Sequence, residues 1–289
     1  MKIGVFTVSM PEYDIPDTIK VLKELGYDGV EWKVSPPAPV EKPENYSFDN
    51  RYWSYNLSTI DTNKIESVAN EIKGQCRNSG IEIYSLTTYL TLWDIEEIQK
   101  VIRAAKIMEC GIIRVNLPFY DEKDNYNCVF DRAKEQAKVV EKLAEASNVK
   151  IVFETHMGGI IPSASAAYRF VSGFNPEHIG VIYDPGNMVY EGFENYKIGV
   201  ELLGKYLANV HLKNASWNFS GTDEDGIDSW TPEASTLKKG SANLKKLVEI
   251  LKGAGYQGFL SVEDFSNDED TYTKLKNNIG FIKLLLGQV

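Results

Sequence analysis

Four side chains that can bind a metal ion stand at the ends of separate apolar segments. Glu154 ends KIVFE and is followed two residues later by His156. Asp184 ends IGVIYD, His211 lies in NVHLK, and Glu263 lies in LSVED. Three carboxylates and one imidazole form an oxygen-rich ligand set, which favours Mn²⁺ or Mg²⁺ and also fits Co²⁺ or Zn²⁺. We predict one divalent metal ion, because carboxylates crowded together without a cation repel one another.

Each of these residues also has an ordinary structural explanation. A glutamate at a strand end is often solvated, DPG is a common turn sequence, and a lone histidine more often forms a hydrogen bond in a core. The metal hypothesis therefore rests on the whole set. The chain has three histidines; His156 and His211 fall at these segment ends, whereas His178 precedes a predicted strand.

The segments that carry these residues belong to a repeated pattern of strands and helices. Strands are predicted at residues 2–8, 28–34, 81–87, 112–116, 150–155, 179–184, 208–213 and 258–264. Segments with helical periodicity separate many of them, such as IPDTIKVLKELG, in which Pro16 suits a first turn and Gly26 a helix end. This alternation indicates parallel pairing through right-handed crossovers. Eight units in 289 residues predict an α/β fold, a single (β/α)8 TIM barrel over residues 1–289.

The predicted barrel places the four candidate ligands on one face, because the C-terminal strand ends form the functional face of such barrels. Two connections, residues 35–60 and 214–239, are too long for plain turns. Both follow strands, so both are predicted on the same rim. Trp217 in the second connection is predicted to stack on a sugar face, and anchoring of the loop to the barrel mouth is the alternative.

Further substrate-binding residues are predicted from the two-residue period of strands. His156 faces the same side as Glu154, and Lys213 faces the same side as His211. His156, Lys213 and Asn187 are therefore predicted to form hydrogen bonds with substrate hydroxyl groups. For Lys213, an ion pair with a carboxylate at the rim is an equally good explanation.

Charge and composition exclude several classes of partner. Lys and Arg total 31 against 41 Asp and Glu, so the net charge is −10. Such a surface repels phosphate backbones and anionic lipid, and we expect neither nucleic acid nor a membrane as partner. The N-terminal segment lacks the apolar region of a signal peptide, which predicts a cytoplasmic protein. Three widely spaced cysteines suggest neither a disulfide framework nor a thiolate zinc site, and a homo-oligomer is compatible with the sequence.

The ordered set Glu154, Asp184, His211 and Glu263, together with the ending GYQGFLSVE, resembles the sugar phosphate isomerase/epimerase family of xylose isomerase-like barrels. The resemblance implies that these four residues hold one divalent cation and that the two glutamates act as acid and base. It also implies ketose or inosose substrates that bind the metal through neighbouring oxygens.

The chain departs from the sugar epimerases of this family at three positions. The epimerases typically carry a histidine where this chain has Asn187, an arginine where it has Trp217, and a second acid where it has Ile160. The resemblance therefore implies the metal site and leaves the identity of the sugar open.

These observations predict a metal-dependent isomerase or epimerase that transfers a proton next to the carbonyl of a ketose or related polyhydroxylated compound. Glu154 and Glu263 are the predicted catalytic acid and base. An inosose-type dehydratase on the same barrel shares the first step and is one alternative. A non-catalytic barrel that binds carbohydrate through its aromatic loops is another. Phosphodiester cleavage by a multinuclear zinc cluster is disfavoured, because the chain has three histidines and a negative net charge.

Overall fold

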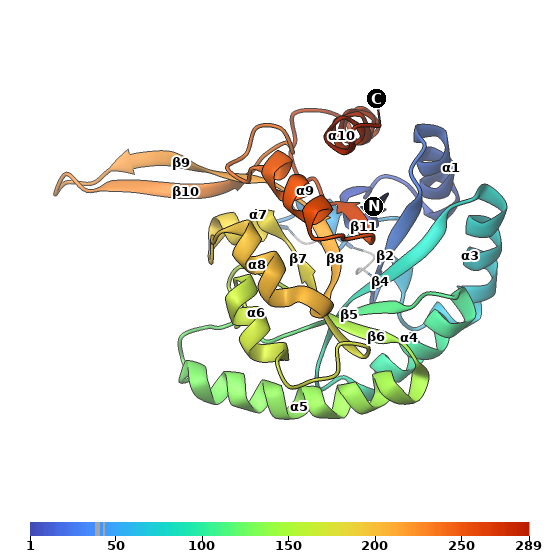
Figure 1. The fold of residues 1–289 in the computed structure, drawn as a ribbon. Coiled ribbons are helices and arrows are strands. Elements are labelled where there is room, and N and C mark those ends of the chain that lie inside the picture. Colours follow the sequence, from blue (N-terminus) through green and yellow to red (C-terminus); the bar gives the residue numbers. More distant parts are fainter. Residues whose placement is uncertain (38–40, 43, 289) are drawn as a thin grey trace.

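The computed structural model describes residues 1–37, 41, 42 and 44–288. Within these residues, eight parallel strands close into a barrel, because β1 pairs with both β2 and β11 (Figure 1). The prediction of a (β/α)8 barrel is confirmed. Its strands are β1 (Lys2–Phe6), β2 (Gly29–Ser35), β4 (Glu82–Thr91), β5 (Ile112–Asn116), β6 (Lys150–Glu154), β7 (Ile179–Tyr183), β8 (Leu207–Leu212) and β11 (Phe259–Val262). The short β3 (Ile60–Asp61) pairs with the end of β2.

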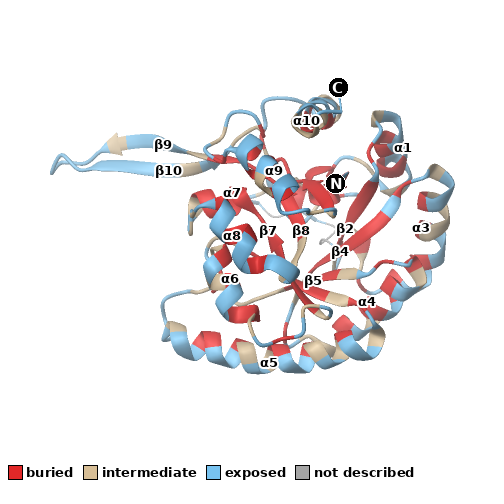
Figure 2. Ribbon diagram, viewed as in Figure 1, coloured by how far each residue is buried: buried red, intermediate tan, exposed pale blue. Residues whose placement is uncertain are grey.

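Helices surround the barrel, each with one buried face, and the barrel strands are almost wholly buried (Figure 2). The helices are α1 (Ile15–Leu25), α2 (Asn50–Trp53), α3 (Ile65–Ser79), α4 (Ile95–Met108), α5 (Tyr126–Ser147), α6 (Ala164–Val171), α7 (Pro185–Tyr190), α8 (Tyr196–Leu203), α9 (Leu244–Gly253) and α10 (Thr271–Leu286). In α1, the Asp14 carboxylate accepts a hydrogen bond from the backbone N–H of Asp17, and Gly26 ends the helix at φ 81°. No helix among the described residues has the length and apolar content needed to cross a membrane.

The two long connections differ in structure. In the first connection, residues 38–40 and 43 lie outside the described residues; the described part contains the short helix α2, and Asn56 donates a hydrogen bond to the Thr7 carbonyl directly after β1. Residues 214–239 contain an antiparallel hairpin of β9 (Ala215–Thr222) and β10 (Asp228–Ala234), which projects away from the barrel (Figure 1). On one face of this hairpin, Phe219 pairs with Trp230. The second connection is therefore an extended arm.

Candidate active site

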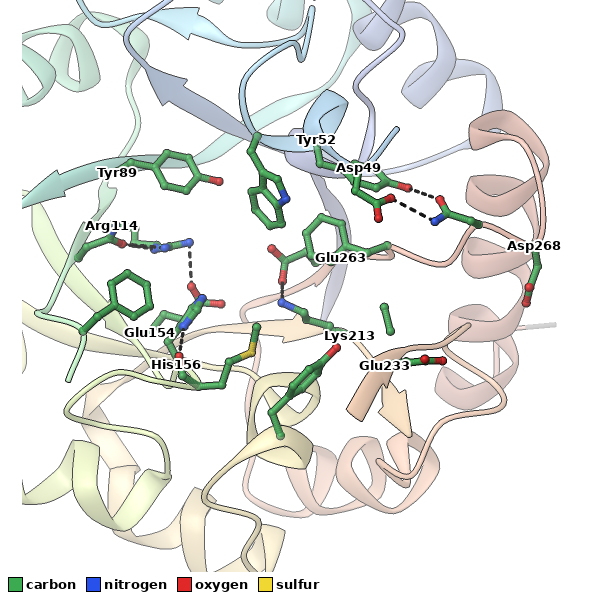
Figure 3. A pocket seen from close by; sticks show the side chains of 18 residues that line it. Asp49, Tyr52, Tyr89, Arg114, Glu154, His156, Lys213, Glu233, Glu263 and Asp268 are labelled. Carbon is green, nitrogen blue, oxygen red and sulfur yellow. Dashed lines mark hydrogen bonds and ion pairs between the residues drawn. The ribbon is translucent and has the colours of Figure 1, made fainter. Parts of the chain in front are cut away.

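A cavity of about 740 Å³ opens at the C-terminal ends of the barrel strands (Figure 3). Glu154, His156, Lys213 and Glu263 lie on its wall. The connection at residues 35–60 contributes to the wall, as do Glu233 and Ala234 at the base of the hairpin. Both long connections therefore reach the rim on which the sequence places them.

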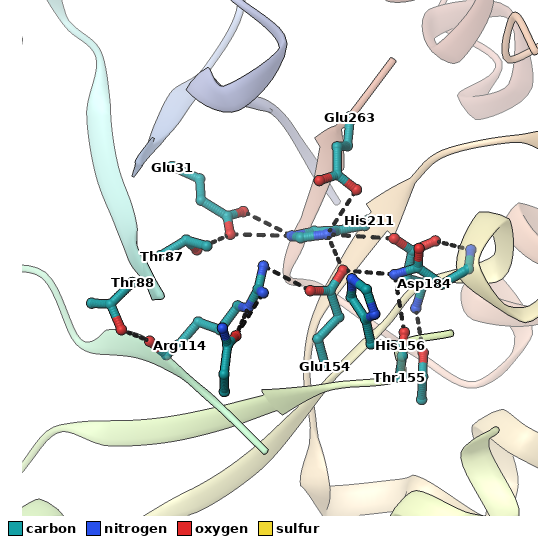
Figure 4. A network of polar contacts seen from close by, with 12 residues as sticks. Glu31, Thr87, Thr88, Arg114, Glu154, Thr155, His156, Asp184, His211 and Glu263 are labelled. Carbon is teal, nitrogen blue, oxygen red and sulfur yellow. Dashed lines mark hydrogen bonds and ion pairs between the residues drawn. The ribbon is translucent and has the colours of Figure 1, made fainter. Parts of the chain in front are cut away.

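The four candidate metal ligands come together in one network of polar contacts (Figure 4), and two of them, Glu154 and Glu263, line the cavity. Glu154, Asp184, His211 and Glu263 each offer one ligand atom, and these atoms all lie within 4.8 Å of one another. The side chains come from the ends of four neighbouring strands, β6, β7, β8 and β11, and all four are buried. Parallel pairing with nearly level strand ends therefore brings distant segments of the sequence to one point.

The two nitrogens of His211 face opposite directions. Nδ1 lies 3.0 Å from Glu154 Oε1, 3.6 Å from Glu263 Oε2 and 3.7 Å from Asp184 Oδ2. Nε2 lies 3.1 Å from Oε1 of Glu31 on β2. Nδ1 is therefore the nitrogen that can bind a metal, with Nε2 held from behind by a carboxylate.

Glu31 is a buried carboxylate that was not predicted from the sequence. Its side chain accepts hydrogen bonds from Asn209 Nδ2 at 3.0 Å, from Ser261 Oγ at 2.7 Å and from the Thr87 hydroxyl. Burial raises the pKa of Glu31, but the charge of His211 and these hydrogen bonds outweigh burial and lower the pKa overall. An ionised Glu31 fixes the orientation of His211 and favours a proton on Nε2.

Two permanent cations lie among the carboxylates. Arg114 on β5 places Nη1 2.8 Å from Glu154 Oε2. Lys213, after β8, places Nζ 3.1 Å from Glu263 Oε2 and 3.8 Å from Asp184 Oδ2. Together with Glu31, the three carboxyl groups of the cluster face these two cations, so two negative charges remain when all four carboxyl groups are ionised and the histidine is neutral. One divalent ion balances that charge.

Asp184 supplies the second sign that the cluster fits a cation. Its Oδ1 accepts the backbone N–H of Asn187 at 2.9 Å and caps α7. Its Oδ2 is buried and accepts no hydrogen bond from any residue that the structure describes. Burial raises the pKa of Asp184 to about 7, because the neighbouring charges offset desolvation only in part. A buried oxygen without a donor, beside two carboxylates and an imidazole nitrogen, suits a divalent ion.

The two glutamates of the ligand cluster are both held in the ionised form. Burial alone would raise the pKa of Glu154, but Arg114 and His211 bring it well below its usual range. Burial opposes ionisation of Glu263 as well, but Lys213 and His211 lower the pKa of this carboxyl to about 2. Each glutamate is therefore a carboxylate that can accept a proton.

The position of Lys213 depends on a glycine at the start of α7. A Cβ atom on Gly186 would lie 2.5 Å from Cγ of Lys213, so any residue other than glycine at position 186 would clash with the lysine side chain. The DPG sequence is thus more than a common turn. Lys213 pairs with a cluster carboxylate, as in the alternative explanation of its role, and it also lines the cavity.

Asn187 and Trp217 lie outside the lining of the cavity that the structure describes. Asn187 is fully buried; its Nδ2 donates to Glu154 Oε1 at 3.1 Å, and its Oδ1 accepts from Lys213 Nζ at 2.8 Å. Trp217 donates its indole N–H to the carbonyl of Val189 on α7 at 2.7 Å. Asn187 therefore links two active-site side chains, and Trp217 anchors the hairpin to the barrel.

His156 presents one nitrogen to the cavity. Its Nδ1 lies 2.7 Å from the carbonyl oxygen of Met157 and donates to it, which leaves Nε2 available to a ligand. Burial lowers the pKa of His156, with Glu154 opposing the shift in part. A neutral imidazole with a free nitrogen can accept a hydrogen bond from a substrate hydroxyl.

Replacement of Glu31 by glutamine is expected to weaken metal binding about tenfold or more, the usual effect of losing a carboxylate that orients a metal-binding histidine. Titration of the metal-free protein with Mn²⁺ by isothermal calorimetry measures the change. Glu82→Gln is the matched control, because Glu82 lies on the neighbouring β4 and pairs with Lys2 at the surface. Unchanged Mn²⁺ affinity in a folded Glu31→Gln variant would show that Glu31 does not orient His211 for metal binding.

The chain resembles known proteins over most of its length. A family model described as xylose isomerase-like TIM barrel matches residues 19–284. The inosose dehydratase of Geobacillus thermodenitrificans (strain NG80-2) is 25% identical over 129 residues, which are 42% of this chain and 42% of that protein. The chain spans about half the length of the curated relatives it matches.

Solved structures share the fold across the whole chain. The 3-keto-D-glucoside 4-epimerase of E. coli superposes with a TM-score of 0.72 at 16% identity, covering 98% of this chain and 99% of that one. The IOLI protein with a bound zinc atom superposes with a TM-score of 0.73 at 15% identity, covering 100% and 99%. Because the family model matches nearly the whole chain, the protein belongs to the xylose isomerase-like TIM barrel family.

Proposed function

We propose that the protein is a divalent-metal-dependent isomerase or epimerase that transfers a proton next to the carbonyl group of a ketose or related polyhydroxylated compound. One observation carries the proposal: two ionised glutamates from separate strands, Glu154 and Glu263, border one cavity beside a buried cluster that suits a divalent ion. Mn²⁺ or Mg²⁺ matches the oxygen-rich donor set best.

The chemistry divides between the ion and the side chains. A divalent ion held by Glu154, Asp184, His211 and Glu263 would polarise a substrate carbonyl and stabilise the negative charge that develops on its oxygen. One glutamate, as a carboxylate, removes the proton from the adjacent carbon, and the other returns a proton that it has first taken up from solvent. His156 accepts a hydrogen bond from a substrate hydroxyl, and Lys213 donates one from the cavity wall.

The fate of the proton defines the reaction. Its return to the opposite face of the same carbon gives epimerisation, and its return to the next carbon gives isomerisation. Loss of a β-hydroxyl group after the same first step gives dehydration, the reaction named for the curated relatives, which this chain matches over about half of their length. The shared first step is therefore the part of the mechanism to test first.

Incubation of the Mn²⁺-loaded protein with a panel of ketoses in deuterated water is expected to place deuterium at the carbon next to the carbonyl. Mass spectrometry detects the exchange, and NMR of the products separates epimers, isomers and dehydrated compounds. A chelator should stop the exchange. Ligand binding without exchange for every ketose would favour a non-catalytic carbohydrate-binding barrel instead.

A further inference from the structure

The cavity extends well beyond the groups that the proposed proton transfer uses. Its volume of about 740 Å³ lies in the upper half of the range for clefts that bury drug-sized ligands, about 300–1,000 Å³. Glu154 and His156 lie on one side, whereas Asp49, Tyr52 and Asp268 lie on the other (Figure 3). A monosaccharide bound at the metal cluster leaves this outer part empty.

The outer part has an aromatic wall. The rings of Trp53 and Phe265 lie 4.9 Å apart, and those of Tyr52 and Phe265 lie 5.0 Å apart. Tyr52 is buried, whereas Trp53 lines the cavity and remains 45% exposed. Phe265 also lies near the candidate metal ligands, because Lys213 Nζ, which pairs with Glu263, is 4.8 Å from its ring centre. The wall therefore leads from the reacting groups to an open tryptophan face, on which the apolar face of a sugar ring can pack.

Hydrogen bonds between two connections hold this wall in place. Arg51 Nη2 donates to the Tyr52 hydroxyl at 2.6 Å and to Asn267 Oδ1 at 2.9 Å. Asn267 Nδ2 donates in turn to Asp49 Oδ1 at 3.2 Å. Helix α2 is thus joined to the segment after β11. Such a surface binds a ligand without first having to become ordered.

The charges along the cavity wall disfavour phosphorylated ligands. The acidic residues that line the cavity are Asp49, Glu154, Glu233, Glu263 and Asp268. Among the described lining residues, Arg114 and Lys213 are the permanent cations, and both are paired with cluster carboxylates. Phosphate recognition needs free arginine or lysine donors. Carboxylates accept hydrogen bonds from sugar hydroxyls and repel phosphate.

From these features we propose that the ligand is a neutral, unphosphorylated keto-sugar glycoside with two rings. The keto sugar lies at the metal cluster, and the second sugar ring packs on Trp53 and Phe265 and donates hydrogen bonds to Asp49 and Asp268. The rim carboxylates favour a hydroxylated ring over an apolar group at this position. The inference rests on the proposed function for the placement of the keto sugar, and on the outer wall alone for the second ring.

Calorimetric titration of the Mn²⁺-loaded protein with D-fructose, fructose 6-phosphate and the ketose disaccharides lactulose, maltulose, turanose and isomaltulose tests the proposal. At least one disaccharide is expected to bind about tenfold or more tightly than fructose, and fructose 6-phosphate more weakly. Trp53→Ala should abolish the gain for the disaccharide and leave the fructose affinity unchanged. Trp53→Phe, which retains an aromatic ring, should keep part of the gain.

Trp93→Ala is the matched control, because Trp93 is 46% exposed and lies outside the described lining of the cavity. It should bind every sugar as the wild type does. The proposal is overturned if no disaccharide binds more tightly than fructose, if the gain survives in Trp53→Ala, or if fructose 6-phosphate binds most tightly. Proton exchange is a separate readout. A preference for a disaccharide without proton exchange would rule out the proposed function and support the second-ring site. Proton exchange without that preference would support the proposed function and rule out the second-ring site.

Discussion

Turnover by the Glu263→Gln variant is expected to fall about a hundredfold or more, the usual scale for losing a positioned acid or base. Glutamine keeps the size of the side chain and one carbonyl oxygen for the ion, but it cannot accept a proton. Its amide also no longer pairs with Lys213, whose Nζ lies 3.1 Å from Glu263 Oε2. The measurement is ketose turnover together with solvent-proton exchange, at a metal content verified by elemental analysis.

Glu154→Gln is expected to show a loss of the same order, because Glu154 lies at the other end of the ligand cluster and also borders the cavity. The two substitutions can slow proton removal and proton return to different extents. If one glutamate removes the proton and the other returns it, exchange and product formation should be affected differently. A fully metallated Glu263→Gln variant that exchanges and turns over at the wild-type rate would rule out the two-glutamate mechanism and leave the metal site untouched.

The barrel and the ligand cluster were predictable for the same physical reason. Parallel strands in a barrel end at one face, so Glu154, Asp184, His211 and Glu263 at four successive strand ends must converge. The strand ranges needed for this argument are accurate to within a few residues. The convergence of these side chains depends on the order of the strands and on where each strand ends, and the hydrophobic pattern of the sequence indicates both.

Glu31 and Arg114 were not predicted, because they belong to strands whose last residues are not ligands. Glu31 lies in the middle of β2, between Val30 and Trp32, yet its side chain reaches His211. The stagger of the strands decides whether an inward-facing side chain lies at the same height in the barrel as the candidate metal ligands, and this stagger is a property of the closed barrel. A charged residue inside an apolar strand was the available signal in both cases.

Trp217 was predicted either to stack on a sugar or to anchor its loop to the barrel mouth, and its hydrogen bond to the Val189 carbonyl agrees with the second of these. Trp217 was chosen because its segment is polar and long, but the segment forms a paired hairpin in which Trp217 binds α7. Trp53 lines the cavity instead, held there by the short helix α2. Helices α6 and α8 have eight residues each, which gives little more than two turns of periodicity in the sequence. Short elements depend on tertiary packing more than on local pattern.

The double variant His211→Ala, Asp184→Ala is expected to lose the bound metal ion almost completely. The substitutions remove the imidazole nitrogen and the Asp184 Oδ2 atom, which accepts no hydrogen bond from any described residue. Glu154 and Glu263 remain, but Arg114 and Lys213 can neutralise them without an ion. Elemental analysis after dialysis against Mn²⁺ and gel filtration measures the content, with about one ion per chain expected for the wild type.

His178→Ala is the matched control, because it removes a histidine outside the cluster and should keep full metal content. Loss of the Asp184 cap on α7 costs about 1 kcal/mol, so the fold of the double variant must be verified by circular dichroism. Full occupancy in a folded double variant would place the ion elsewhere. Mn²⁺ at a hundred times its dissociation constant should stabilise the wild type by about 2.7 kcal/mol and leave the double variant unchanged, because an ion stabilises the fold only through the site it binds.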